Sequence, residues 1–101
     1  MDIIKKLAEE LQIRPGQAQA AVKLIDEGNT IPFISRYRKE VTGALNDEVL
    51  RNLNDRLTYL RNLEEKKTQV LSSIEEQGKL TEELKKQILE AQTLVVVEDL
   101  Y

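Results

Sequence analysis

Apolar residues recur at intervals of three and four along most of this chain, which is the spacing of one face of an α-helix. Near the amino terminus the pattern runs through Ile3, Ile4, Leu7 and Leu11 and predicts a helix over residues 2–12. A second run passes through Ala18, Ala21, Val22 and Ile25, after Pro15 and before Gly28. Proline is tolerated in the first helical turn and glycine is favoured just past a helix end, so a second helix is expected between them.

The next stretch, "NTIPFISRYRKEVTG", predicts one short helix, with Thr30 as its N-cap, Pro32 in its first turn and Gly43 at its end. Its apolar residues lie on one side of such a helix, and we expect all of them in the core: Phe33, Ile34, Tyr37 and Val41. Together with the preceding helix, residues 15–39 resemble a helix-turn-helix unit.

The strongest helical prediction covers about residues 46–77, which contain neither glycine nor proline. A helix of that length spans roughly 45 Å. Leucines at 50, 53, 57 and 60 form a seam, but Glu64 and Lys67 occupy its next two positions before Leu71 and Ile74 resume it, while Leu63 and Val70 form a neighbouring stripe. A parallel coiled coil needs several intact heptads, so a spine that packs its two ends against different neighbours is the favoured interpretation, and the coiled coil stays open.

After Gly78, Thr81 is expected to cap a short helix over about residues 82–91. The tail, residues 93–101, reads "TLVVVEDLY" and is ambiguous, because its valines favour a strand and "EDLY" favours a helix. The prediction for the whole chain is an all-α fold with a helix-turn-helix-like part and one long helix.

Composition narrows the partners that this fold could take. The net charge is −3, and the pI is near 5.1. That balance argues against general attraction to phosphates or to an anionic membrane, so any contact with nucleic acid must be local. No apolar run approaches the ~20 residues of a membrane span, and we expect no membrane partner.

Two residue types that are common in catalytic and metal sites are missing from the chain. The chain has no histidine and no cysteine, which removes the commonest general base, thiol nucleophile and zinc ligands. Its adjacent glutamates, such as Glu75 and Glu76, diverge by about 100° on a helix and cannot jointly grip a metal. We therefore expect no catalysis, no metal and no cofactor, and the lack of cysteine makes a cytoplasmic location the default.

One basic cluster remains: Arg36, Arg38 and Lys39. On a helix Arg36 and Lys39 share a face, where they could meet phosphates, while Arg38 turns away and could pair with Asp26 or Glu27. An ordinary Arg36–Glu40 pair would explain the same residues without any ligand. The tyrosines at 37, 59 and 101 are too far apart in sequence to predict a paired stacking platform.

The motifs "LIDEGNTIPFISRYRKEVTGALNDE", "YLRNLEEKK" and "SIEEQGKLT" closely resemble the N-terminal helical region of the Tex family of bacterial transcription accessory proteins. The resemblance extends over nearly the whole chain. Ser35 and Asn46 stand where the family usually has Ala and Asp. Since Asn caps a helix about as well as Asp, this difference leaves the expected fold unchanged.

The resemblance implies a non-catalytic segment of a protein that binds RNA or single-stranded nucleic acid, mainly through other domains. In the family these are an RNase H-like domain, a helix-hairpin-helix unit and an OB-fold domain, none of which we expect within this chain. The implied partners are RNA, the transcription machinery or those other domains, with weak nucleic-acid contact at Arg36, Arg38 and Lys39. The alternative is a protein-interaction or self-association module that uses the leucine seam or the valine-rich tail.

Overall fold

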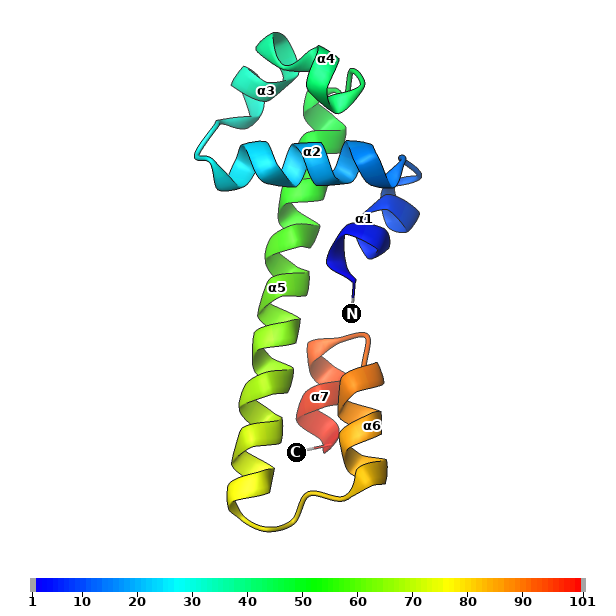
Figure 1. Cartoon of the computed structure of the whole chain (residues 1–101), viewed down its shortest axis with the longest axis vertical. Coiled ribbons are helices and arrows are strands. Elements are labelled where there is room, and N and C mark those ends of the chain that lie inside the picture. The colour runs from blue at the N-terminus through cyan, green and yellow to red at the C-terminus, as the bar shows by residue number, and fades with distance from the viewer. Residues whose placement is uncertain (1, 101) are drawn as a thin grey trace. The chain divides into compact units, whose positions relative to one another are not determined.

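A computed structural model describes residues 2–100 of the chain, and these residues form seven helices and no strand. The predicted all-α class is therefore confirmed. The helices, shown in chain order in Figure 1, are α1 (Ile3–Leu11), α2 (Pro15–Asp26), α3 (Ile31–Tyr37), α4 (Lys39–Thr42), α5 (Asp47–Glu76), α6 (Glu82–Glu90) and α7 (Leu94–Leu100). They belong to two compact units, one within residues 2–59 and one within residues 60–100, and the long helix α5 contributes its first part to one and its second part to the other.

Two side-chain caps and one proline mark where α1, α5 and α2 begin. Asp2 accepts a hydrogen bond from the backbone N–H of Lys5 at the start of α1. Pro15 occupies the beginning of α2, as predicted. Asn46 accepts from the N–H of Val49 at 2.9 Å and so caps α5. Each cap satisfies a backbone donor that has no partner inside its own helix.

The predicted single helix over "IPFISRYRKEVT" is instead two helices. Thr30 caps α3 as expected, accepting from the N–H of Phe33, but Arg38 leaves helical geometry at φ −127° and ψ 29°. The chain then starts again as α4 and ends at Gly43, whose φ of +70° lies in the left-handed region that glycine adopts at low cost.

This break overturns most of the core predicted for the stretch. Ile34 is fully buried, whereas Phe33, Tyr37 and Val41 are 36%, 60% and 48% exposed. A helix as short as α3 turns only one narrow row of side chains toward the core, and in α3 this row contains Ile34. Phe33 and Tyr37 belong to the neighbouring row, which stays at the surface. Val41 belongs to a separate helix, α4, so the direction expected for its side chain from one continuous helix does not apply.

Small side chains let helices of the first unit come close. Ala18 and Ala21 are both fully buried on α2, which packs against α1, α3 and α4. The other buried apolar side chains of this unit come from every one of its helices except α4, and one comes from the turn before α5: Leu7, Ala8, Val22, Leu24, Ile34, Leu45, Leu50, Leu53 and Leu57. The amide of Gln17 on α2 donates to the carbonyls of Thr42 and Gly43, at 3.2 and 3.3 Å, and ties α2 to the turn before α5.

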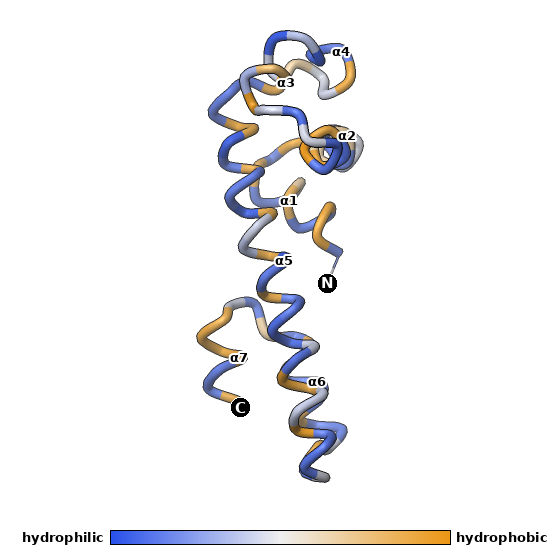
Figure 2. The backbone as a smooth tube through the Cα atoms, turned by 90° about the vertical axis from the view of Figure 1, so that its left-hand side faces the viewer, coloured by the Kyte–Doolittle hydropathy of each residue, from blue (hydrophilic) through white to orange (hydrophobic). Residues whose placement is uncertain are grey.

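Along α5 the leucine seam continues where a break was predicted. Figure 2 shows hydrophobic positions recurring between hydrophilic ones along this helix. The residues of the seam are all buried, at intervals of three or four: Leu50, Leu53, Leu57, Leu60, Leu63, Lys67, Val70 and Ile74. The buried row passes through Leu63 and Val70, the neighbouring stripe noted in the sequence, and it also includes Lys67, so the predicted interruption at Lys67 was wrong.

Lys67 is only 1% exposed, which is unusual for a lysine side chain. Its Nζ donates to the carbonyl of Leu89 at 2.9 Å and lies 3.4 Å from Oε1 of Glu64. Leu89 is in the last turn of α6, where backbone carbonyls lack helical partners and a cation is favoured. Lys67 thus joins α5 to the end of α6 within the second unit.

The ambiguous tail is helical. Thr93 accepts a hydrogen bond from the N–H of Val96 and starts α7, which packs against α6. Val97 is fully buried, while Val95 and Val96 are 65% and 42% exposed. Tyr101 lies outside the described residues. Within residues 2–100, no helix is both long enough and apolar enough to cross a membrane.

Candidate nucleic-acid interface

The three predicted basic residues lie around the junction of α3 and α4, and we call Arg36, Arg38 and Lys39 the cationic corner. Arg36 is in the last turn of α3, Arg38 is the non-helical residue at the break, and Lys39 begins α4. Because the break falls among them, their directions follow from the structure rather than from the periodicity of one helix.

Arg36 and Lys39 are exposed, and no other described residue forms an ion pair or hydrogen bond with either side chain. The Arg36–Glu40 pair considered from the sequence is accordingly not formed. Both residues line one hollow of about 370 Å³ together with residues 44–47 at the start of α5. Asp47 also lines this hollow and partly offsets the two positive charges. The arrangement leaves two cations available to an external anion.

Arg38 is half-buried and contacts the protein itself. Its guanidinium carbon lies 5.2 Å from the centroid of the Phe33 ring, and a guanidinium nitrogen donates to the carbonyl of Tyr37 at 3.2 Å. The expected carboxylate partner, Asp26 or Glu27, is not among these contacts. A guanidinium over an aromatic face is attracted by the ring quadrupole, so Arg38 holds its place while keeping its charge near the surface.

Phe33 and Tyr37 form an aromatic pair that sequence reasoning missed. Their ring centroids are 5.3 Å apart, with planes inclined by 46°, and both rings are partly exposed. The signal was present as an i, i+4 spacing, but both residues had been assigned to the core. Beside the cationic corner, the pair adds two partly exposed aromatic rings, inclined to each other by 46°, to the available positive charge.

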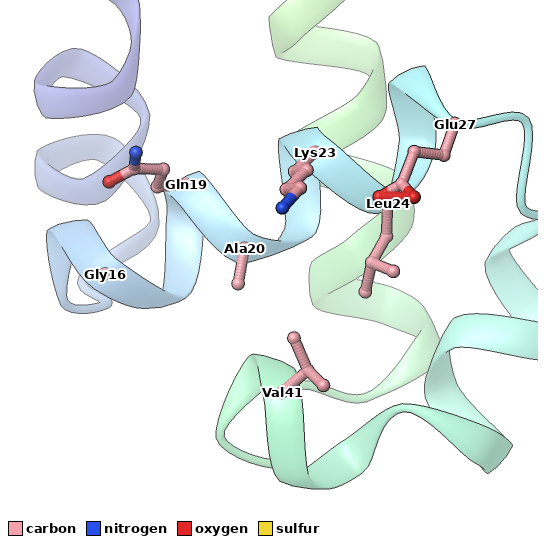
Figure 3. A pocket seen from close by; sticks show the side chains of 7 residues that line it. All are labelled: Gly16, Gln19, Ala20, Lys23, Leu24, Glu27 and Val41. Atoms are coloured by element: carbon pink, nitrogen blue, oxygen red, sulfur yellow. The ribbon is translucent and has the colours of Figure 1, made fainter.

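A second hollow, also of about 370 Å³, lies between α2 and α4. Figure 3 shows Val41 of α4 pointing toward Ala20 and Leu24 of α2. Lys23 and Glu27 carry opposite charges at its edge, so it favours neither sign of ligand. Among residues 2–100 no group of three acidic side chains is placed to hold a metal ion.

The best-defined ion pair of the first unit joins α1 to α5. Arg56 donates from two nitrogens to the two carboxylate oxygens of Glu10, at 2.6 and 3.0 Å. These hydrogen bonds are the main reason that the pKa of Glu10 is lowered from its ordinary value, with smaller contributions from the charges of Arg56 and Lys6. The same contact raises the pKa of Arg56, whose guanidinium also lies over the ring of Tyr59. This pair is structural and separate from the cationic corner.

The fold and this site define a class: a small all-α domain that presents exposed cationic and aromatic side chains at the junction of α3 and α4. Comparison with known families gives the finer assignment, since the model of the Tex-like protein N-terminal domain matches residues 1–75. The chain therefore belongs to the Tex-like N-terminal domain family, as its sequence motifs predicted.

Relatives support this membership over nearly the full chain. The chain is 58% identical over 95 residues to the Escherichia coli (strain K12) protein YhgF, covering 94% of this chain and 12% of that protein. It is 54% identical over 101 residues to a Neisseria gonorrhoeae protein named transcriptional accessory protein Tex, covering 100% of this chain and 13% of that one. A human protein named S1 RNA-binding domain-containing protein 1 is 34% identical over 97 residues, covering 96% of this chain and 10% of that one. The chain thus spans about an eighth of the length of its bacterial relatives.

Proposed function

We propose that this chain is a non-catalytic helical module of a Tex-like transcription accessory protein, and that its cationic corner makes weak contact with RNA or single-stranded nucleic acid. The module holds the corner in place, and the stronger nucleic-acid binding of the whole protein belongs to other domains. A cytoplasmic location and partners in the transcription machinery are part of the same proposal.

The observation that carries the proposal is the availability of Arg36 and Lys39. Both are exposed, neither has a hydrogen-bond or ion-pair partner for its side chain among residues 2–100, and both line one hollow. Cations that are not used within a fold are free to neutralise phosphates, and phosphate contacts dominate sequence-independent nucleic-acid binding. The names of two relatives, a transcriptional accessory protein and an S1 RNA-binding domain protein, support the same direction.

The test is a fluorescence-anisotropy titration of the chain with a single-stranded RNA oligonucleotide. We expect the double variant Arg36→Gln, Lys39→Gln to bind several-fold more weakly than the wild type, because it removes the two available cations. The matched control is Lys85→Gln, Lys86→Gln on α6, which changes the net charge equally at two exposed lysines of the other unit. Equal affinities of wild type and the Arg36, Lys39 variant would contradict the proposal.

Self-association is a second candidate function, favoured by the exposed apolar side chains of α7. Val95 and Val96 are accessible, while the leucine seam of α5 is buried within the chain and is not available for a coiled-coil dimer. Light scattering over a concentration series tests this. A mass that rises with concentration and returns to that of a monomer in Val95→Lys would support self-association, and a constant monomer mass would exclude it.

A further inference from the structure

We infer that the Phe33–Tyr37 pair is a stacking surface for an unpaired base, so that the corner takes single-stranded rather than double-stranded nucleic acid. The inference rests on the proposed function, because the cationic corner must first hold the phosphates. The inference adds base stacking to the proposed phosphate contacts, and it adds Phe33 and Tyr37 to the residues that bind.

The first step of the argument is that the two rings are placed at the surface by the fold. Ile34 anchors α3 in the core with no exposed surface, and Phe33 and Tyr37 lie on the row beside it. Tyr37 is the more accessible ring, at 60% exposure. A large aromatic side chain left in water gives up the stabilisation that burial provides, and clusters of such residues mark binding surfaces.

The second step is that the pair is held in a defined geometry. The rings are 5.3 Å apart, and the guanidinium of Arg38 lies over Phe33 while it donates to the Tyr37 carbonyl. Arg38 therefore covers one face of Phe33 and restrains the turn that carries Tyr37. A ring whose surroundings are fixed loses less conformational entropy when a base stacks on it.

The third step is charge complementarity around the rings. Residues 31–39 contain three basic side chains and no acidic one, and the nearest carboxylates in sequence are Asp26 and Glu27 before this segment and Glu40 after it. Single-strand binders combine cations that follow the phosphates with aromatic rings that stack on bases. In a duplex the bases are already stacked on each other, so a ring can stack on one of them only after base steps are separated, which costs a few kcal/mol.

The experiment compares two single-stranded RNA oligonucleotides of equal length, one intact and one with abasic sites, at the same salt concentration. We expect Tyr37→Leu to weaken binding of the intact oligonucleotide by at least about fivefold, the lower end of the loss seen for a stacked base. Binding of the abasic oligonucleotide should not change. An intact oligonucleotide containing 2-aminopurine should also lose fluorescence on binding the wild type and less on binding Tyr37→Leu.

Tyr59→Leu is the matched control, because Tyr59 is a tyrosine of the same unit that lies outside the cationic corner, with the guanidinium carbon of Arg56 4.9 Å from its ring centroid. It should leave both affinities unchanged, and circular dichroism melts establish that each variant is folded. Tyr37→Leu removes an exposed ring, so its melting temperature should stay near that of the wild type.

The possible failures are distinguishable. If Tyr37→Leu binds both oligonucleotides as the wild type does while Arg36→Gln, Lys39→Gln is impaired, the stacking inference is overturned and the proposed function stands. The aromatic pair would then be a surface for a protein partner. If the wild type binds neither oligonucleotide, the proposed function fails, and the stacking inference fails with it.

Discussion

Lys67 illustrates how a single residue can change role between sequence and structure. In the sequence it interrupts a leucine seam, and in the fold it belongs to that seam with its ammonium group against the last turn of α6. Its four-carbon stem fills an apolar position, while the charge satisfies a carbonyl that has no helical partner. The residue is accommodated because the terminal group reaches a partner that lies 22 residues further along the chain.

Replacing Lys67 should therefore destabilise the second unit. Lys67→Met keeps most of the stem volume but loses the hydrogen bond to the Leu89 carbonyl, and we expect it to cost about 1–3 kcal/mol of unfolding free energy. Lys67→Ala also leaves a cavity, so it should cost more. Urea unfolding gives the two values. Hydrogen exchange should show the loss of protection mainly within residues 60–100, and a Lys67→Met variant as stable as the wild type would show that the stem alone matters.

At the scale of helices, the connection between α2 and the turn before α5 sets the position of the cationic corner. The Gln17 amide reaches the carbonyls of Thr42 and Gly43, so the backbone after α4 is fixed against α2. Two features favour glycine at position 43. Its φ of +70° lies in the left-handed region, and a Cβ at this position would lie 2.5 Å from Nε2 of Gln17. Gly43 and the side-chain amide of Gln17, both outside the cationic corner, therefore hold the backbone that follows it.

Gly43→Ala should consequently destabilise the chain by about 1–3 kcal/mol, since it combines backbone strain with the displacement of Gln17. Gly16→Ala is the matched comparison, because Gly16 lies inside α2 and nothing is within 4 Å of the Cβ that it would gain. That change should stabilise the chain by about 0.5–1 kcal/mol through better helix propensity. Thermal unfolding followed by circular dichroism compares the two, and equal effects of the same sign would refute the role given to Gly43.

For the whole molecule, the balance of charge limits what the corner can do. The net charge of −3 means that distant charges repel a polyanion, so attraction must come from the few cations close to it. The proposed contact is therefore local and weak, and it should depend on a small number of phosphates.

The dependence of binding on salt measures that number. With two or three phosphates contacted on a single strand, the plot of log K against log salt concentration should have a slope of about −1.4 to −2.1. Anisotropy titrations at several concentrations of a monovalent salt give the slope, and the Arg36→Gln, Lys39→Gln variant should flatten it. A slope several times steeper would mean that a surface larger than the cationic corner is involved.

Local sequence determined most of the secondary structure. Helix periodicity, Pro15 and Gly28 located α1 and α2, Thr30 and Thr81 were predicted as caps and act as caps, and the long helix ends within a residue of its predicted limits. These signals work because helix ends depend on backbone groups only a few residues away. Family membership was also predicted from the sequence, because the motifs that carry it are short continuous stretches of the chain, and the family model over residues 1–75 confirms it.

Tertiary structure decided which side chains are buried and which are available. Whether Phe33 and Tyr37 face the core, whether Lys67 interrupts the seam, and whether Arg38 meets a carboxylate or a ring all depend on contacts made after the chain has turned. Hydrophobic periodicity predicts a broad apolar face on a helix. Which row of side chains within that face is buried depends on where the neighbouring helices pack. The break at Arg38 could not be foreseen because the residues on both sides are compatible with one helix. The sequence therefore determined the helices, and packing decided the site.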